Sequence, residues 1–268
     1  MVQPPRSQPF VRQAGIGPTV VCLHSNASSS SQWRGLMDQL APSFTVLAPD
    51  SYGAGKSPEW PSDRTITLDD EVRLLETVIF GTPDKLVLVG HSYGAAVALM
   101  TALRYPEKIR ALVVYEPTLF MLEAAAVPSP NGVDGIRNAV ELAGQALDSG
   151  DTDTAAGHFI DFWMGNGSWA ATPVERKPAI AKSIVNVRRW IHSLITESTP
   201  LAAFAALNMP VLYMMGERSP ESAHAVARRL MPVLPRVIEM RFNDLGHMAP
   251  ITHAETVNAA IVDFLKKL

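Results

Sequence analysis

The chain has 268 residues, of which 47% are hydrophobic, and a formal net charge of −3. This length allows a large buried core, and the weak negative charge without a basic segment excludes a nucleic-acid-binding protein. The chain has no apolar run of about 18 residues and its start, MVQPPRSQPF, lacks a secretory leader, so we expect a cytoplasmic protein without a membrane partner. The single cysteine, Cys22, lies in an apolar run, which excludes a disulfide framework and favours a buried core side chain.

Short apolar runs rich in Val, Leu and Ile recur along the chain, at residues 19–24, 44–49, 85–90, 111–116, 210–216 and 236–242. Their hydrophobicity is continuous rather than alternating, which is typical of strands that are buried on both faces of a parallel sheet. Segments with helical periodicity lie between the first four runs, at residues 31–41, 68–79 and 95–109. This order predicts an α/β fold with a doubly wound, mostly parallel sheet.

The alternation of strands and helices stops at about residue 118 and resumes near residue 201. The intervening segment reads as helices and loops, and Pro128 marks its entry and Pro200 its exit. We therefore predict an α/β core of residues 1–117 and 201–268, with residues 118–200 as a helical cap inserted between two strands. Large side chains are frequent in this cap, and we expect most of them in its own core and the rest around an apolar pocket: Phe120, Met121, Phe159, Phe162, Trp163, Met164, Trp169 and Trp190.

The stretch APDSYGAGKS, residues 48–57, ends like a nucleotide-binding P-loop. That motif requires a glycine where this chain has Asp50, and a carboxylate at this place would repel a polyphosphate. The glycines instead predict a tight turn at the carboxyl edge of the sheet, in which Asp50 hydrogen-bonds the loop backbone and Lys56 faces solvent. We expect this loop to form a wall near a substrate pocket.

The segment Gly90-His91-Ser92-Tyr93-Gly94 directly follows a predicted strand and opens a predicted helix. G-x-S-x-G in this setting is typical of a strained turn that exposes a nucleophilic serine, so we predict that Ser92 is the nucleophile. A serine hydroxyl needs a base to remove its proton. His247 follows the last predicted strand, where the chain can return it to the same sheet edge, and is the predicted base.

In these features the chain resembles the α/β-hydrolase family, over nearly its whole length. The resemblance is strongest to the small-molecule branch with esterases, lactonases, carbon–carbon bond hydrolases and haloalkane dehalogenases. It implies a catalytic triad, a substrate pocket under the cap, and an oxyanion hole of two backbone N–H groups. The family's H-G-x loop corresponds to His24-Ser25-Asn26, with Ser25 in place of the usual glycine, so the implied donors are the N–H groups of Asn26 and Tyr93.

The third member of the implied triad departs from the usual pattern of the family. The acid commonly follows the strand after the cap as G-x-x-D, and this chain has Gly216-Glu217-Arg218-Ser219 there. Some members carry the acid at the end of the strand before the cap, where this chain has Glu116. A carboxylate at the end of a buried strand needs a partner, which favours Glu116 over Glu217, with Asp244 third.

These residues predict a serine hydrolase that cleaves a small, largely apolar ester or lactone through an acyl-enzyme. Dehalogenases and epoxide hydrolases of the family use a carboxylate nucleophile, so Ser92 disfavours both reactions. A lyase or acyltransferase on the same scaffold stays open, as does a non-catalytic small-molecule receptor. The chain has no H-x-x-x-H or C-x-x-C pattern, so we expect no metal and no cofactor, a small-molecule substrate as partner, and an open oligomeric state that includes a homo-oligomer.

Overall fold

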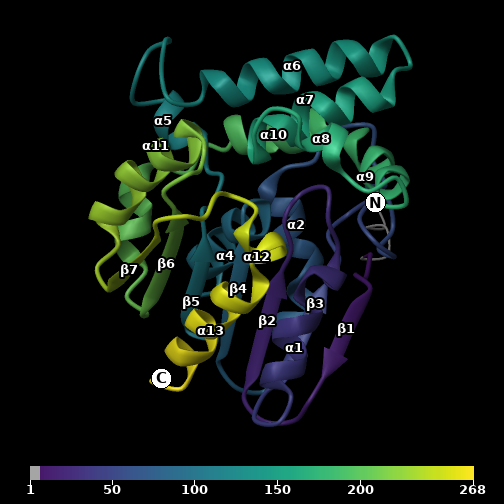
Figure 1. Ribbon diagram of the computed structural model, residues 1–268. Coiled ribbons are helices and arrows are strands. Elements are labelled where there is room, and N and C mark those ends of the chain that lie inside the picture. Colours follow the sequence, from purple (N-terminus) through teal and green to yellow (C-terminus); the bar gives the residue numbers. More distant parts are fainter. Residues whose placement is uncertain (1–6) are drawn as a thin grey trace, which may run out of the picture.

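The computed structural model describes residues 7–268; the first six residues, part of the start from which we predicted localisation, lie outside it. Within the described residues one sheet has the strand order β1-β3-β2-β4-β5-β6-β7 (Figure 1). Its parallel strands match the six predicted runs: β2 Thr19–Leu23, β3 Thr45–Pro49, β4 Leu86–His91, β5 Ile109–Tyr115, β6 Val211–Gly216 and β7 Val237–Phe242. The predicted mostly parallel α/β fold is confirmed.

A further strand, β1 (Val11–Ala14), was not predicted. It pairs antiparallel with β3 at the edge of the sheet. Its sequence VRQA is short and only partly buried, so it lacks the continuous apolar run that marks the inner strands.

The sequence predicts no membrane-spanning segment. Among the described residues, no helix is both long enough and apolar enough to cross a membrane.

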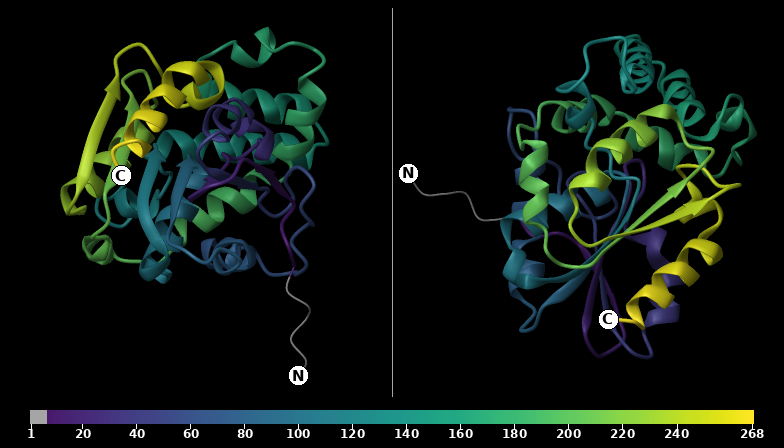
Figure 2. Two further views of the ribbon diagram at one scale, coloured as in Figure 1. Left: turned by 90° about the horizontal axis from the view of Figure 1, so that it is seen from below. Right: turned by 90° about the vertical axis from the view of Figure 1, so that its left-hand side faces the viewer.

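Helices cover both faces of the sheet (Figures 1 and 2). On one face lie α2 Leu68–Leu74, α3 Glu76–Phe80, α4 Tyr93–Arg104 and α11 Glu221–Leu230, and on the other lie α1 Arg34–Leu40 and α13 Ala254–Leu265. Successive strand side chains alternate between the two layers: Val21 joins the first hydrophobic core and Cys22 the second. The inner strands β4 and β6 are buried along their whole length, which explains their continuous apolar runs, whereas the edge strand β7 (VIEMRF) carries two charged side chains and is only partly buried. Cys22 is fully buried, as predicted, and burial raises the pKa of its thiol.

Two predicted helices differ from the observed ones. The segment predicted as one helix at residues 68–79 divides into α2 and α3 at Leu75. The helix predicted at residues 95–109 begins at Tyr93 and ends at Arg104. Its early end follows from Pro106, because a proline disfavours helical backbone in the residue before it. Neither difference moves the strands that position the site.

The segment between β5 and β6 forms helices that lie over the carboxyl edge of the sheet (Figure 1). They are α5 Met121–Ala124, α6 Asp134–Asp148, α7 Thr152–Met164, α8 Ser168–Ala171, α9 Lys177–Ile184 and α10 Val187–Ile195. Phe120 and Trp163 belong to the same hydrophobic core as the face of the sheet covered by α4. These helices therefore close the top of the sheet, while the predicted domain boundaries at residues 118 and 200 stay a prediction.

Candidate active site

Ser92 occupies a strained turn between β4 and α4. Its backbone has φ 56° and ψ −116°, a conformation that is uncommon for any residue other than glycine. The turn is tight because its flanking residues carry no side chain: a Cβ on Gly94 would lie 2.3 Å from the carbonyl oxygen of Leu23, and one on Gly90 would lie 2.6 Å from the Cα of Ala95. The glycines thus allow the close packing that exposes the serine hydroxyl at the carboxyl edge of the sheet.

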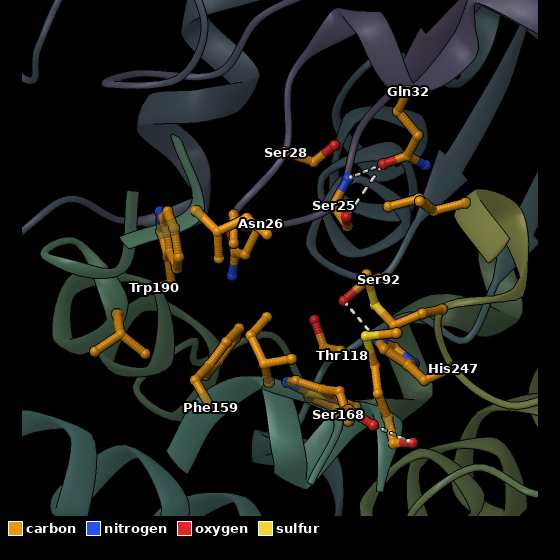
Figure 3. Close-up of a pocket in the computed structure, with 18 of the residues that line it drawn as sticks. Ser25, Asn26, Ser28, Gln32, Ser92, Thr118, Phe159, Ser168, Trp190 and His247 are labelled. Carbon is orange, nitrogen blue, oxygen red and sulfur yellow. Dashed lines mark hydrogen bonds between the residues drawn. The ribbon is translucent and has the colours of Figure 1, made fainter. Parts of the chain in front are cut away.

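A continuous line of hydrogen bonds connects Ser92, His247 and Glu116. His247 lies in the loop between β7 and α12 (Ala249–Thr252), and its Nε2 is 2.9 Å from Ser92 Oγ (Figure 3). Its Nδ1 is 2.7 Å from Glu116 Oε2. The three side chains are nearly excluded from solvent, with exposed fractions of 6% for Ser92, 1% for His247 and 0% for Glu116. The structure therefore brings the three predicted residues together in the order that proton transfer requires.

Glu116 is held from two neighbouring strands. It follows β5 with a φ of 45°, which turns its side chain out of the strand path. Its Oε1 accepts the backbone N–H of Gly216, the last residue of β6, at 2.7 Å and the hydroxyl of Ser219, in the loop after β6, at 2.6 Å. With the imidazole of His247, three donors satisfy the buried carboxylate. The sequence showed Ser219 only as the position where the usual aspartate is absent. In the structure its hydroxyl supports Glu116, the carboxylate predicted to replace that aspartate.

The two other carboxylates that we considered for the triad lie elsewhere. Glu217 Oε1 pairs with Arg241 at 2.9 Å. Asp244 Oδ1 pairs with Arg218 at 2.8 Å, and its side chain is largely exposed. Among the described residues the carboxylate that contacts the imidazole of His247 is that of Glu116.

The two predicted oxyanion donors, Asn26 and Tyr93, carry backbone N–H groups that have no hydrogen-bond partner within the described part of the chain. Tyr93 is the first residue of α4, where helical N–H groups have no intrahelical acceptor. Asn26 follows β2, which is the neighbour of β4 in the sheet, and it lines the cavity beside Ser92. Both groups are therefore free to bind a negatively charged oxygen at this edge.

Gln32 connects the loop of Asn26 to the loop of His247, a role that sequence reasoning missed. Its Oε1 accepts both the N–H and the hydroxyl of Ser25 at 3.1 Å. Its Nε2 donates to His91 Nδ1 at 3.1 Å, and His91 Nε2 donates to the carbonyl oxygen of His247 at 2.8 Å. Burial and the neighbouring His247 lower the pKa of His91 well below its usual value, so the ring is neutral and can accept on one side and donate on the other. No sequence pattern marks a glutamine in this role.

The opposite side of the same loop is fixed by His24. Its Nδ1 donates to the carbonyl oxygen of Ser25 at 2.7 Å, and its Nε2 accepts the N–H of Ser51 at 3.1 Å. Burial lowers the pKa of His24, which favours this neutral arrangement. The loop in which Ser25 replaces the glycine of the family is thus held through both its N–H and its carbonyl group.

The loop of residues 48–57 supports the site through hydrogen bonds to the segment that follows Asn26. The carboxylate of Asp50 accepts the N–H of Ser30 at 2.5 Å and that of Lys56 at 2.9 Å, so it hydrogen-bonds the loop backbone as predicted. The carboxylate packs directly against Gly55, because a Cβ at that position would lie 2.1 Å from Asp50 Oδ2. Lys56 is exposed, also as predicted. The prediction that this loop forms a pocket wall is wrong: other segments of the described chain line the cavity, and Asp50 instead positions the turn that follows Asn26.

A cavity of about 770 Å³ opens above Ser92 and His247 (Figure 3). The core contributes polar groups to its wall, among them Ser25, Asn26 and Gln32. The helices between β5 and β6 contribute large apolar side chains, and five of the eight predicted as core or pocket residues line it: Phe120, Phe159, Trp163, Met164 and Trp190. This size and mixture are typical of a site for a small molecule.

Trp163 makes the closest contact between these helices and the hydrogen-bonded line. Its ring stacks on the imidazole of His247, with centroids 3.8 Å apart and planes inclined by 23°. Trp163 is itself buried in α7. The indole covers one face of the imidazole and keeps the ring in the plane defined by Ser92 and Glu116.

Residues 18–254 match the family model of the alpha/beta hydrolase fold, and the chain belongs to this family. It is 28% identical over 239 residues to 2-(acetamidomethylene)succinate hydrolase of Mesorhizobium japonicum, covering 85% of this chain and 82% of that protein. It is 25% identical over 267 residues to 2-hydroxymuconate semialdehyde hydrolase of Pseudomonas sp. strain CF600, covering 95% of this chain and 89% of that protein. The predicted family is confirmed, and these relatives are named hydrolases.

Two further comparisons concern a partial sequence match and a structural match at low identity. The chain matches an uncharacterized protein of Mycobacterium tuberculosis with 28% identity over 160 residues, which are 55% of this chain and 46%, about half, of that relative. An esterase from Exiguobacterium antarcticum superposes with a TM-score of 0.78 at 17% identity, covering 96% of this chain and 95% of that one. At this identity the likeness concerns the fold.

Proposed function

We propose that the protein is a serine hydrolase that cleaves a small, largely apolar ester or lactone through an acyl-enzyme. The observation that carries the proposal is the buried line of hydrogen bonds from Ser92 through His247 to Glu116. A serine hydroxyl with an imidazole acceptor, itself oriented by a carboxylate, is the arrangement that activates serine for attack on a carbonyl carbon.

In the acylation step, Ser92 Oγ attacks the carbonyl carbon while His247 Nε2 takes the serine proton. Glu116 accepts the Nδ1–H and stabilises the imidazolium. The negative charge on the former carbonyl oxygen is bound by the N–H groups of Asn26 and Tyr93, each of which typically contributes about 3 kcal/mol to such a transition state. The carbon–oxygen bond to the alcohol then breaks, and the alcohol leaves with the proton from His247.

In the deacylation step, a water molecule takes the place of the alcohol. His247 removes its proton as the water oxygen attacks the acyl carbon, and the same N–H groups bind the second oxyanion. The bond to Ser92 Oγ breaks, the serine regains its proton from His247, and the acid is released. The two steps together consume one water molecule and regenerate the free enzyme.

The cavity supports the substrate class of the proposal. Its apolar wall of Phe120, Phe159 and Trp190 fits a hydrocarbon portion, and its volume suits a molecule of small size. The relatives from Mesorhizobium japonicum and Pseudomonas are named as hydrolases of 2-(acetamidomethylene)succinate and of 2-hydroxymuconate semialdehyde, which supports hydrolysis of a small molecule. An acyltransferase would share the acylation step and differ in the second nucleophile.

Covalent labelling tests the proposal. A fluorophosphonate probe reacts with serines that have an activated hydroxyl, so we expect it to label the wild-type protein and not Ser92→Ala. The exposed Ser62→Ala is the control and should label like the wild type. Wild-type protein that binds a small ester but neither takes up the probe nor releases acid would be a receptor, and the proposal would be wrong. Transfer to an added alcohol in preference to water would identify an acyltransferase.

A further inference from the structure

Thr118 presents a hydroxyl to the cavity that no protein group satisfies. It lies two residues after Glu116, where the chain leaves β5 and enters the cap, and 2% of its surface is exposed. Its Oγ1 has no hydrogen-bond partner among the described residues. Figure 3 shows this oxygen projecting into the open region next to Ser92. The hydroxyl is thus aimed at the place where a substrate of Ser92 would lie.

The surroundings of Thr118 explain why its hydroxyl needs a partner from outside the protein. Phe120 and Trp163 line the same cavity and belong to one hydrophobic core, so they add apolar surface and no hydrogen-bond partner. A buried polar group without a hydrogen bond typically costs about 1–3 kcal/mol. Valine has nearly the same shape without this cost, so packing alone does not account for a threonine here.

A second buried threonine shows that a missing hydrogen-bond partner alone does not identify a binding residue. Thr101 in α4 also has an unpartnered hydroxyl and is fully buried, but it lies within the core and outside the cavity wall. Its hydroxyl has no access to a ligand. Position in the cavity beside Ser92, and not the missing partner alone, therefore distinguishes Thr118.

We propose that Thr118 is a specificity residue whose hydroxyl binds a second oxygen function of the substrate, a hydroxyl or a carbonyl group close to the scissile carbonyl. The preferred substrate is then an oxygenated ester or lactone, apolar at its far end, rather than a plain alkyl ester. A hydroxyl can donate to a carbonyl oxygen or accept from a substrate hydroxyl, so it suits both functions. The inference rests on the proposed function for the position of the scissile carbonyl.

Matched substrates and matched variants test the inference. The probes are methyl 4-phenylbutanoate with its 2-hydroxy and 3-hydroxy derivatives, for the acyl part, and ethyl with 2-hydroxyethyl 4-phenylbutanoate, for the alcohol part. The readout is the ratio of kcat/KM for the oxygenated ester to that for the plain ester. We expect Thr118→Val to lower this ratio about tenfold in one of the two series, which corresponds to the loss of one hydrogen bond.

Two further variants serve as controls. Thr118→Ser keeps the hydroxyl and should keep the ratio, and Thr101→Val makes the same chemical change at an equally buried position and should leave the ratio at its wild-type value. An unchanged ratio in Thr118→Val for both series would overturn the inference, because the hydroxyl would then bind water and not the substrate.

Binding separates this inference from the proposed function. In a Ser92→Ala background, calorimetry compares the Kd of each oxygenated ester with and without Thr118→Val, with no turnover needed. We expect the second substitution to weaken binding of the oxygenated ester about tenfold and to spare the plain ester. Should Ser92 prove not to be a nucleophile, this difference would still decide the role of Thr118; equal affinities would contradict it.

Discussion

At the scale of single residues, Glu116 is marked as the proposed triad acid by its hydrogen bonds more than by its place in the chain. Glu116 leaves β5 with a left-handed backbone conformation, which costs free energy and persists because the surroundings compensate for it. The compensation comes from the neighbouring strand, through Gly216 and Ser219, and from His247. The serine at the position of the usual aspartate is thus linked by a hydrogen bond to the glutamate one strand earlier.

Glu116→Gln tests this assignment directly. The amide keeps the size of the side chain but removes the charge that stabilises the imidazolium, and its NH₂ group can force the wrong tautomer on His247. We expect kcat to fall by about ten-thousandfold, as in triads whose acid is made neutral, with a thermal unfolding midpoint close to the wild-type value. Glu217→Gln is the control and should stay near wild-type activity, because Glu217 pairs with Arg241. The opposite pattern would make Glu217 the acid.

The sequence predicted those site residues whose positions follow from strand ends, and missed those that act through side-chain geometry. Ser92 and Glu116 each follow a buried strand and His247 follows the partly exposed edge strand β7, and parallel strands bring their carboxyl ends to one edge. Gln32 and Trp163 approach the site from a turn and from the cap, and their distances to His91 and His247 depend on tertiary packing. Periodicity and motif spacing carry no information on such contacts.

At the scale of secondary-structure elements, the continuous apolar runs predicted every inner strand, because burial on both faces leaves no polar positions. β1 escaped detection since an edge strand of four residues needs no such run. For the loop of residues 48–57, the sheet edge and the hydrogen bonds of Asp50 were predicted correctly, but the loop does not line the cavity, because the sequence shows the turn and not its distance from the pocket. Helix α2 carries a buried carboxylate, Glu71, that no motif marked.

Glu71 makes the stability of the protein depend on pH. Burial raises its pKa to about 8 from an ordinary value of 4.5, and the hydrogen bond from the N–H of Tyr52 and the contact with the hydroxyl of Tyr93 counter this only in part. Below pH 4.5 both the folded and unfolded states hold the proton. Between that pH and about 8 the unfolded chain loses it first, so the free energy of unfolding decreases as pH rises, by up to about 1.4 kcal/mol per unit.

Glu71→Gln removes the titration. We expect the unfolding midpoint of this variant, relative to that of the wild type, to rise steadily between pH 5 and pH 8 and to level off above, in differential scanning fluorimetry over this range. The exposed Glu107→Gln, an equal chemical change, should show no such trend. A difference between Glu71→Gln and wild type that stays constant with pH would show that Glu71 is ionised in the folded state.

At the scale of the whole molecule, the sheet supplies the reacting groups and the helices between β5 and β6 supply the enclosure. The segment leaves the sheet after Glu116 and returns to it through β6, at whose carboxyl end Gly216 and Ser219 donate to the Glu116 carboxylate. Trp163 joins the two parts through its contact with His247. We therefore expect the side chains of these helices to set the size of the substrate and the sheet edge to carry the chemistry.

Phe159→Leu tests this division of roles. Phe159 lines the cavity from α7, and the smaller side chain enlarges the apolar part without touching Ser92, His247 or Glu116. We expect kcat/KM for 4-nitrophenyl octanoate to rise relative to that for the acetate, by several-fold for roughly one or two additional methylenes of space. Phe80→Leu, the same substitution at a half-exposed position on α3, should leave the ratio unchanged. Equal ratios in both variants would place the acyl chain outside the cap.

The most direct test of the account is the acyl-enzyme itself. Wild-type protein mixed with 4-nitrophenyl butyrate, quenched with acid within one turnover and digested, should yield the peptide that contains Ser92 with the mass of one butyryl group added. His247→Ala should accumulate no such adduct on this timescale, because the serine proton has no acceptor. Hydrolysis by the wild-type protein without a modified Ser92 peptide, or with the butyryl group on another residue, would contradict the assignment of Ser92 as nucleophile.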